Sequence, residues 1–109
     1  MKNGNLALIS FDECRRFLKI VYGPEHTITI TNVIDMSKGK RGFGFLIDNY
    51  EGENALATGY ISFKEKFCDI SLIKPSNEVV TTECDDLYRE FIQQLIAETE
   101  EKTSKNLSL

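Results

Sequence analysis

Residues 27–31 form the run Thr27-Ile28-Thr29-Ile30-Thr31, in which apolar side chains alternate with β-branched polar ones. A period of two is typical of a half-buried β-strand, because successive side chains of a strand point to opposite faces of the sheet. Upstream of this run, apolar residues recur at helical spacing instead. The change of period predicts a helix followed by a sheet, and it decides the class of fold.

The helix predicted upstream covers residues 10–22. Ser10 and Glu13 have the spacing of a capping box, in which each side chain satisfies a free backbone N–H of the other residue. Gly23-Pro24 ends the helix, because proline cannot continue it. One apolar stripe runs along the helix at helical spacing: Phe11, Cys14, Phe17, Leu18 and Val21.

Three further runs with strand character follow residue 31. In the first of them, Phe43, Phe45 and Ile47 share one face. The connections between the runs are too short for the crossover that parallel strands require. We therefore expect an antiparallel meander of about four strands that ends at Pro75. The other two runs are residues 55–63 and 67–74. Residues 5–9 could form an additional short strand before the first helix.

The C-terminal segment predicts a second helix, which Thr82 caps and which frays near Lys102. Its apolar stripe comprises Cys84, Leu87, Tyr88, Phe91, Ile92 and Leu95. Because each helix has a single apolar stripe, both helices are expected on the same face of the sheet. The predicted fold is a two-layer α+β sandwich with one open sheet face. Residues 1–102 form a single domain, and residues 103–109 form a flexible C-terminal tail.

The composition is that of a soluble globular domain, with 109 residues, 41% apolar residues and a formal net charge of −4. No apolar run is long enough for a membrane span, and the N-terminus does not resemble a signal peptide. Cys14, Cys68 and Cys84 are widely spaced, which is typical neither of a disulfide framework nor of a zinc site. A reducing, cytoplasmic location is expected.

Catalytic residues are scarce in this sequence. His26 is the only histidine and follows a predicted turn, and none of the common nucleophile, metal or phosphate-loop motifs is present. The carboxylates are not paired in a pattern that implies a raised pKa. We therefore expect a protein that is not an enzyme and that needs no cofactor or metal ion.

Residues 40–46, Lys40-Arg41-Gly42-Phe43-Gly44-Phe45-Leu46, resemble the first ribonucleoprotein motif of the RNA-recognition motif family. The resemblance implies a single-stranded RNA-binding domain in which Phe43 and Phe45 stack on bases and Arg41 contacts phosphate, with Lys40 as a further RNA-binding residue. The alternative interpretation is structural. In that case Phe43 and Phe45 face the core beneath the helices, and the glycines ease a bend of the strand.

Negative charge is concentrated near the C-terminus. Residues 78–101 hold eight acidic side chains and the single base Arg89, a formal charge of −7, whereas the rest of the chain has a charge of +3. The structural interpretation is a solvated helix face. The functional interpretation is a docking face for a basic protein partner. The residues predicted for such a face are Asp48, Glu51, Glu53, Glu83, Asp86 and Glu90.

Small acidic proteins without catalytic residues include bacterial immunity proteins that neutralise nuclease toxins. Nucleases are basic, so an acidic protein can compete with their substrate. An immunity or inhibitor protein is therefore the leading hypothesis, and single-stranded RNA binding through residues 40–46 is the alternative. A third hypothesis is a small secretion-chaperone-like or adaptor dimer that uses the open sheet face. The oligomeric state is left open by the sequence.

Overall fold

The computed structural model describes residues 6–35, 39–50 and 55–107. Five antiparallel strands lie between two helices in the chain, in the spatial order β1-β2-β3-β4-β5. A 3₁₀ turn, η1 (Leu6–Leu8), precedes them. The elements are α1 (Phe11–Tyr22), β1 (Ile28–Asp35), β2 (Lys40–Ile47), β3 (Ala57–Lys64), β4 (Cys68–Ile73), β5 (Val79–Glu83) and α2 (Asp85–Leu107).

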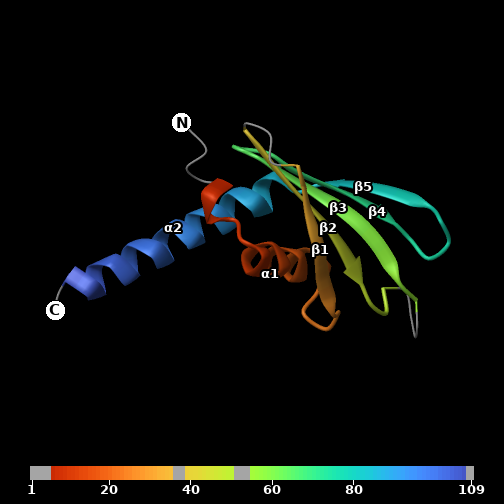
Figure 1. Cartoon of the computed structure of the whole chain (residues 1–109), viewed down its shortest axis with the longest axis horizontal. Helices are drawn as coiled ribbons and strands as arrows, with labels where there is room; N and C mark the ends of the chain where they lie inside the picture. The colour runs from red at the N-terminus through yellow and green to blue at the C-terminus, as the bar shows by residue number, and fades with distance from the viewer. Residues whose placement is uncertain (1–5, 36–38, 51–54, 108–109) are drawn as a thin grey trace.

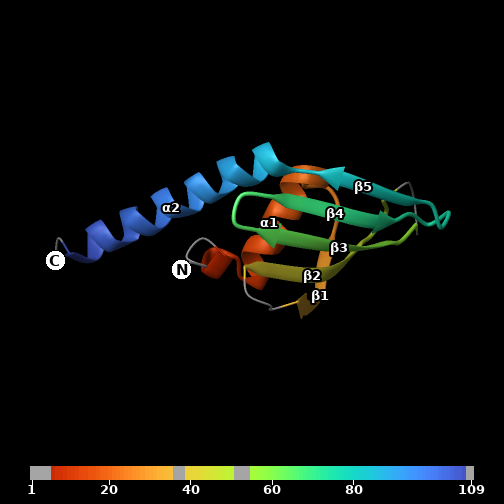
Figure 2. The same cartoon turned by 90° about the horizontal axis from the view of Figure 1, so that it is seen from above.

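Both helices lie on the same side of the curved sheet, which confirms the predicted two-layer α+β arrangement (Figure 1). α1 lies against the sheet, whereas α2 begins at the β5 edge and extends well past the strands (Figure 2). The molecule is consequently elongated, with principal extents of 52 × 29 × 23 Å. The opposite face of the sheet is covered by neither helix.

The structure confirms the predicted first helix, with Ser10 as its N-cap and Gly23 at its end, whereas the Glu13 carboxylate pairs with Arg16 rather than with the Ser10 N–H. The Ser10 Oγ accepts a hydrogen bond of 3.2 Å from the Glu13 backbone N–H. Gly23 follows the helix with a φ of 113°, in the region that favours glycine. Cys14, Phe17 and Leu18 of the predicted stripe are buried, whereas Phe11 at the start of the helix is 49% exposed.

The C-terminal part of the sheet differs from the prediction by one strand. Pro75 does not end the sheet but lies in the turn between β4 and β5, where the Asn77 N–H donates to the Lys74 carbonyl at 2.8 Å. Thr82 lies within β5, so the prediction that it caps α2 is wrong. At five residues β5 is too short for a clear period of two in the sequence, and the proline before it has the appearance of a terminator.

Two smaller expectations concern the ends of the chain. Residues 6–8 form a 3₁₀ turn rather than a strand, with the Ile9 N–H donating to the Leu6 carbonyl at 3.0 Å. Leu6 and Ile9 are buried in the core, which accounts for the apolar run without an additional strand. At the other end, α2 continues past Lys102 to Leu107.

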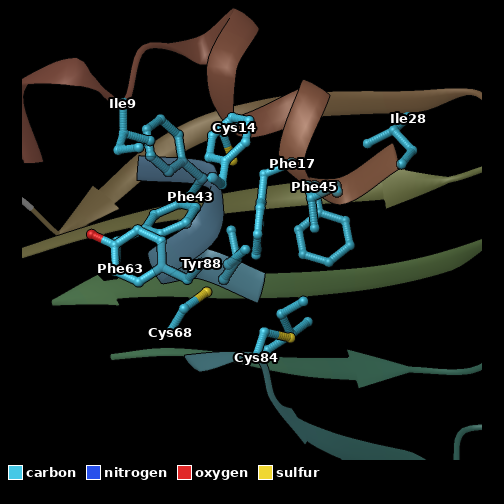
Figure 3. Packing of buried hydrophobic residues seen from close by; sticks show 14 of the residues in the cluster. Ile9, Cys14, Phe17, Ile28, Phe43, Phe45, Phe63, Cys68, Cys84 and Tyr88 are labelled. Atoms are coloured by element: carbon cyan, nitrogen blue, oxygen red, sulfur yellow. The ribbon is translucent and has the colours of Figure 1, made fainter. Parts of the chain in front are cut away.

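Aromatic rings fill the layer between the sheet and the helices (Figure 3). The Phe17 ring of α1 packs against Phe63 at 5.8 Å and against Phe91 of α2 at 5.2 Å between centroids. Tyr88 is fully buried, and its hydroxyl donates to the Lys64 carbonyl at 2.8 Å. This bond satisfies the polar end of a core tyrosine and attaches α2 to the end of β3.

Two glycines leave room for aromatic rings on the two faces of the sheet. On the helix face, Phe45 lies directly opposite Gly59, and a Cβ on Gly59 would come within 2.9 Å of the Phe45 Cε1. On the open face, a Cβ on Gly42 would come within 2.7 Å of the Tyr60 Cζ. Phe45 is enclosed, whereas Tyr60 is only half-buried and can move toward solvent.

This difference predicts unequal effects of the same substitution on the free energy of unfolding. Gly59→Ala should lower it by about 2 kcal/mol, because the enclosed Phe45 ring must leave its rotamer. Gly42→Ala should change it by less than about 1 kcal/mol, because Tyr60 can swing away. Urea unfolding followed by circular dichroism measures both. Equal stability of the two variants would contradict the described packing.

Candidate functional site

Phe43 and Phe45, predicted from the ribonucleoprotein-like motif to stack on bases, belong to the core. Their exposed fractions are 0% and 1%, and the Phe43 ring packs against Phe63 at 6.0 Å. The expectation that they are exposed is therefore wrong, and the alternative interpretation of these two rings is confirmed. A ring enclosed between a sheet and a helix is not accessible to a base.

The two basic residues of the same motif lie on opposite faces of β2. The Arg41 guanidinium lies over the Phe43 ring at 5.4 Å, on the helix face. The Lys40 Nζ lies 6.0 Å from the centre of the Tyr60 ring, on the open face. The structure therefore does not bring Lys40 and Arg41 together with exposed aromatic rings into one surface.

The acidic residues of the predicted docking face lie at two ends of the sheet. Asp48 follows β2 and is exposed near the end of the sheet where Val79 begins β5. Glu83 lies at the other end of β5, from which α2 departs (Figure 1). The structure does not bring the turn at Asp48 together with the start of α2. Glu51 and Glu53 lie outside the described residues.

One part of the predicted face is assembled at the junction of β5 and α2. Asp69 and Glu83 are direct neighbours across the β4–β5 pair on the open face. Asp86 and Glu90 follow on α2, four residues apart and therefore on one side of the helix. All four side chains are exposed. We call Asp69, Glu83, Asp86 and Glu90 the acidic corner.

One base, Arg89, contacts the acidic corner within the described residues and lines a surface depression together with Glu83 and Asp86. Arg89 forms an ion pair with Asp86 and also donates to the Lys66 carbonyl at 3.1 Å. Within the described parts of the chain, the carboxylates of Asp69 and Glu83 have no ion-pair or hydrogen-bond partner. Like charges directly opposite each other on neighbouring strands are destabilising. No ion pair or hydrogen bond of the described residues holds either carboxylate of the Asp69–Glu83 pair.

Apolar side chains accompany these carboxylates. Phe67, directly before β4, is 56% exposed, and Leu87, in the first turn of α2, is 42% exposed. Leu87 lines a shallow depression of about 340 Å³ together with Glu83 and Asp86. Exposed apolar groups rimmed by charge are characteristic of protein-binding surfaces.

Two acidic residues of the C-terminal segment have structural roles instead. The Asp85 Oδ1 accepts the Cys68 backbone N–H at 2.8 Å, which joins the start of α2 to β4. Glu98 accepts two hydrogen bonds from the Arg16 guanidinium, at 3.1 and 2.7 Å, and so joins α2 to α1. This contact raises the pKa of Arg16, chiefly through its hydrogen bond to Glu98. Part of the −7 charge of residues 78–101 is thus explained by the fold.

The three cysteines are buried and free. Burial raises the pKa of the Cys14 thiol to about 12, well above its ordinary value. A hydrogen bond to Cys84, together with burial, raises the pKa of Cys68 as well. Because the thiolate is the reactive form, Cys14 and Cys68 are poor nucleophiles at neutral pH.

On the open face, a second depression lies beside β5. It has a volume of about 270 Å³ and an almost wholly apolar lining. Val79 and Ile73 are its most exposed apolar residues, at 61% and 44%. The lining residues are Thr58, Gly59, Tyr60, Ser71, Ile73 and Val79. Sequence periodicity could not identify this feature, because Val79, its most exposed apolar residue, belongs to the strand that the sequence does not predict.

Asp85 holds a backbone hydrogen bond of the fold, whereas Asp86 is exposed on the acidic corner. Substitutions of these two neighbours should therefore differ in their effect on the free energy of unfolding. Asp85→Ala should lower the free energy of unfolding by about 1–2 kcal/mol, because it leaves the Cys68 N–H without its acceptor. Asp86→Ala should lower it by less than about 0.5 kcal/mol, since its side chain is exposed. Both variants remove one carboxylate from the same helical turn, so effects of the helix dipole are matched. Thermal unfolding that ranks the two variants in the reverse order would contradict the assignment.

No helix of the described residues combines the length and apolar character needed to cross a bilayer. Within the same ranges, no three His, Cys, Asp or Glu side chains come together as ligands for a metal ion. No protein-family model, curated protein or solved structure matches this chain.

Proposed function

We propose that this chain is a non-enzymatic binding protein that docks a basic protein partner on the acidic corner. The observation that carries the proposal is the register of β4 and β5, which places Asp69 directly opposite Glu83, while neither carboxylate has an ion-pair partner among the described residues. A cationic group placed between the two carboxylates would convert their repulsion into two attractions. The bound state would therefore gain an electrostatic attraction to both carboxylates that is absent in the free protein.

The helical part of the acidic corner supports the same conclusion. Asp86 and Glu90 extend the negative surface along α2 for one further turn. Exposed charges of one sign accelerate the encounter with an oppositely charged protein and discriminate against wrong partners. Phe67 and Leu87 supply the apolar contact area that charge alone does not provide.

The partner class that we propose is a nuclease-type toxin domain, which makes the protein a bacterial immunity protein acting in the cytoplasm. Nucleases attract phosphate backbones with basic grooves, and an acidic protein surface competes for the same groove. The chain's net charge of −4 is consistent with this role. Nothing in the proposal requires a cofactor or a catalytic residue.

Charge reversal on the acidic corner tests this function. The double variant Asp86→Lys/Glu90→Lys should weaken binding to a cognate basic domain by about tenfold per reversed charge at low salt. Asp48→Lys is the matched control, because it changes charge by the same amount per residue at the other end of the sheet. Isothermal titration calorimetry against a panel of purified basic nuclease domains, at two salt concentrations, measures the effect.

Affinity of the unmodified protein should fall as salt rises, and the double variant should lose most of this salt dependence. The proposal fails if no basic domain binds. It also fails if Asp48→Lys weakens binding as much as the double variant does. Melting temperatures of all variants establish that the comparison is made between folded proteins.

A further inference from the structure

β5 is the last strand of the sheet, and among the described residues it pairs with β4 on one side and with no strand on the other. The Cys84 N–H donates to the Cys68 carbonyl at 2.8 Å, and the Lys74 N–H donates to the Glu78 carbonyl at 2.9 Å. Because hydrogen-bonded residues alternate along an antiparallel strand, Val80 and Thr82 also direct their backbone groups toward β4. Val79, Thr81 and Glu83 therefore direct their N–H and C=O groups away from the sheet.

These outward groups form an open edge. No hydrogen bond joins the backbone of Val79, Thr81 or Glu83 to any other described residue outside the sheet. Figure 2 shows β5 at the margin of the sheet, with α2 continuing from its end rather than lying beside it. Unpaired donors and acceptors in such a row are a template for another strand.

The two edges of the sheet are not equivalent. β1, at the opposite edge, has register irregularities between Ile30 and Asn32 and between Val33 and Asp35. Irregularities of this kind twist an edge and discourage further pairing. β5 pairs with β4 in unbroken register from Val79 to Glu83, and four of its five residues are β-branched. The regular edge is thus the one next to the acidic corner.

The side chains along this edge specify the chemistry of an added strand. Val79 borders the apolar depression on the open face, and Glu83 belongs to the acidic corner at the other end of β5. A strand running antiparallel to β5 would therefore present a basic side chain opposite Glu83. Four residues later it would present an apolar side chain opposite Val79, with one residue opposite Thr81 between them.

We propose that β5 accepts an extended, basic segment of the partner as a sixth, antiparallel strand of the sheet. The proposal rests on the function proposed above and adds how the partner is held. Backbone hydrogen bonds to Val79, Thr81 and Glu83 supply affinity, and the alternating side chains supply specificity. A second copy of the chain fits this edge poorly. Antiparallel self-pairing centred on Thr81 would place the Glu83 carboxylate opposite Val79, and both chains have a net charge of −4.

The test uses a seven-residue peptide, blocked at both ends, with lysine, threonine and valine as its second, fourth and sixth residues. Thr81→Pro removes one outward N–H while sparing the ladder to β4, and proline is tolerated at such edge positions. Thr81→Ala is the matched control that keeps the backbone donor. Fluorescence anisotropy of a labelled peptide should show at least tenfold weaker binding to Thr81→Pro and unchanged binding to Thr81→Ala.

A second arm does not depend on the folding of any variant. Backbone N-methylation of the peptide at its second, fourth and sixth residues should abolish binding to the unmodified protein, because those N–H groups face β5. N-methylation at the third and fifth residues should leave binding within about threefold. Equal loss from both methylated peptides would overturn strand addition.

The remaining outcomes distinguish a failure of strand addition from a failure of the proposed docking on the acidic corner. If Thr81→Pro binds the peptide normally while Asp86→Lys/Glu90→Lys does not, docking is electrostatic and strand addition is wrong. If the peptide binds neither to the unmodified protein nor to any variant, strand addition also fails. A dimer in light scattering that Thr81→Pro converts to a monomer would overturn the proposal in favour of a second copy.

Discussion

A single layer of aromatic side chains between the sheet and the two helices organises this molecule. Phe43 and Phe45 of β2 lie in this layer with exposed fractions of 0% and 1%. Phe17 of α1 and Phe91 of α2 meet over the same layer. Because a strand directs alternate side chains to opposite faces, burying Phe43 and Phe45 leaves Gly42 and Gly44 on the other face. The glycines on the helix-free face of β2 are therefore a consequence of this aromatic layer.

Periodicity in the sequence was sufficient for the helix at residues 10–22 and for the order of the first four strands. It could not decide the role of Phe43 and Phe45, because a period of two defines a strand face but not what covers it. β5 was missed for a different reason. Its five residues are too few to establish a period, and Pro75 before them is equally compatible with a turn and with the end of a sheet.

The charge pattern of the sequence was informative at the level of a segment but not of individual residues. Asp85 and Glu98 contribute to the −7 charge, yet each holds part of the fold together through a hydrogen bond. Asp69 lies outside that segment and meets Glu83 only because β4 and β5 pair. The acidic corner is thus a product of strand register, and its role in binding stays a prediction.

In β5, some backbone groups pair with β4 and the others point away from the sheet. This difference links the fold to the proposed binding mode. Hydrogen exchange of individual backbone amides, followed by nuclear magnetic resonance, measures this distinction most directly. The amides of Val80 and Thr82 should exchange at least about a hundredfold more slowly than those of Val79, Thr81 and Glu83, because only the former donate within the sheet. Uniformly fast exchange along residues 79–83 would mean that no fifth strand is formed. Uniformly slow exchange would mean that the edge is already covered, and either result would contradict an open edge beside the acidic corner.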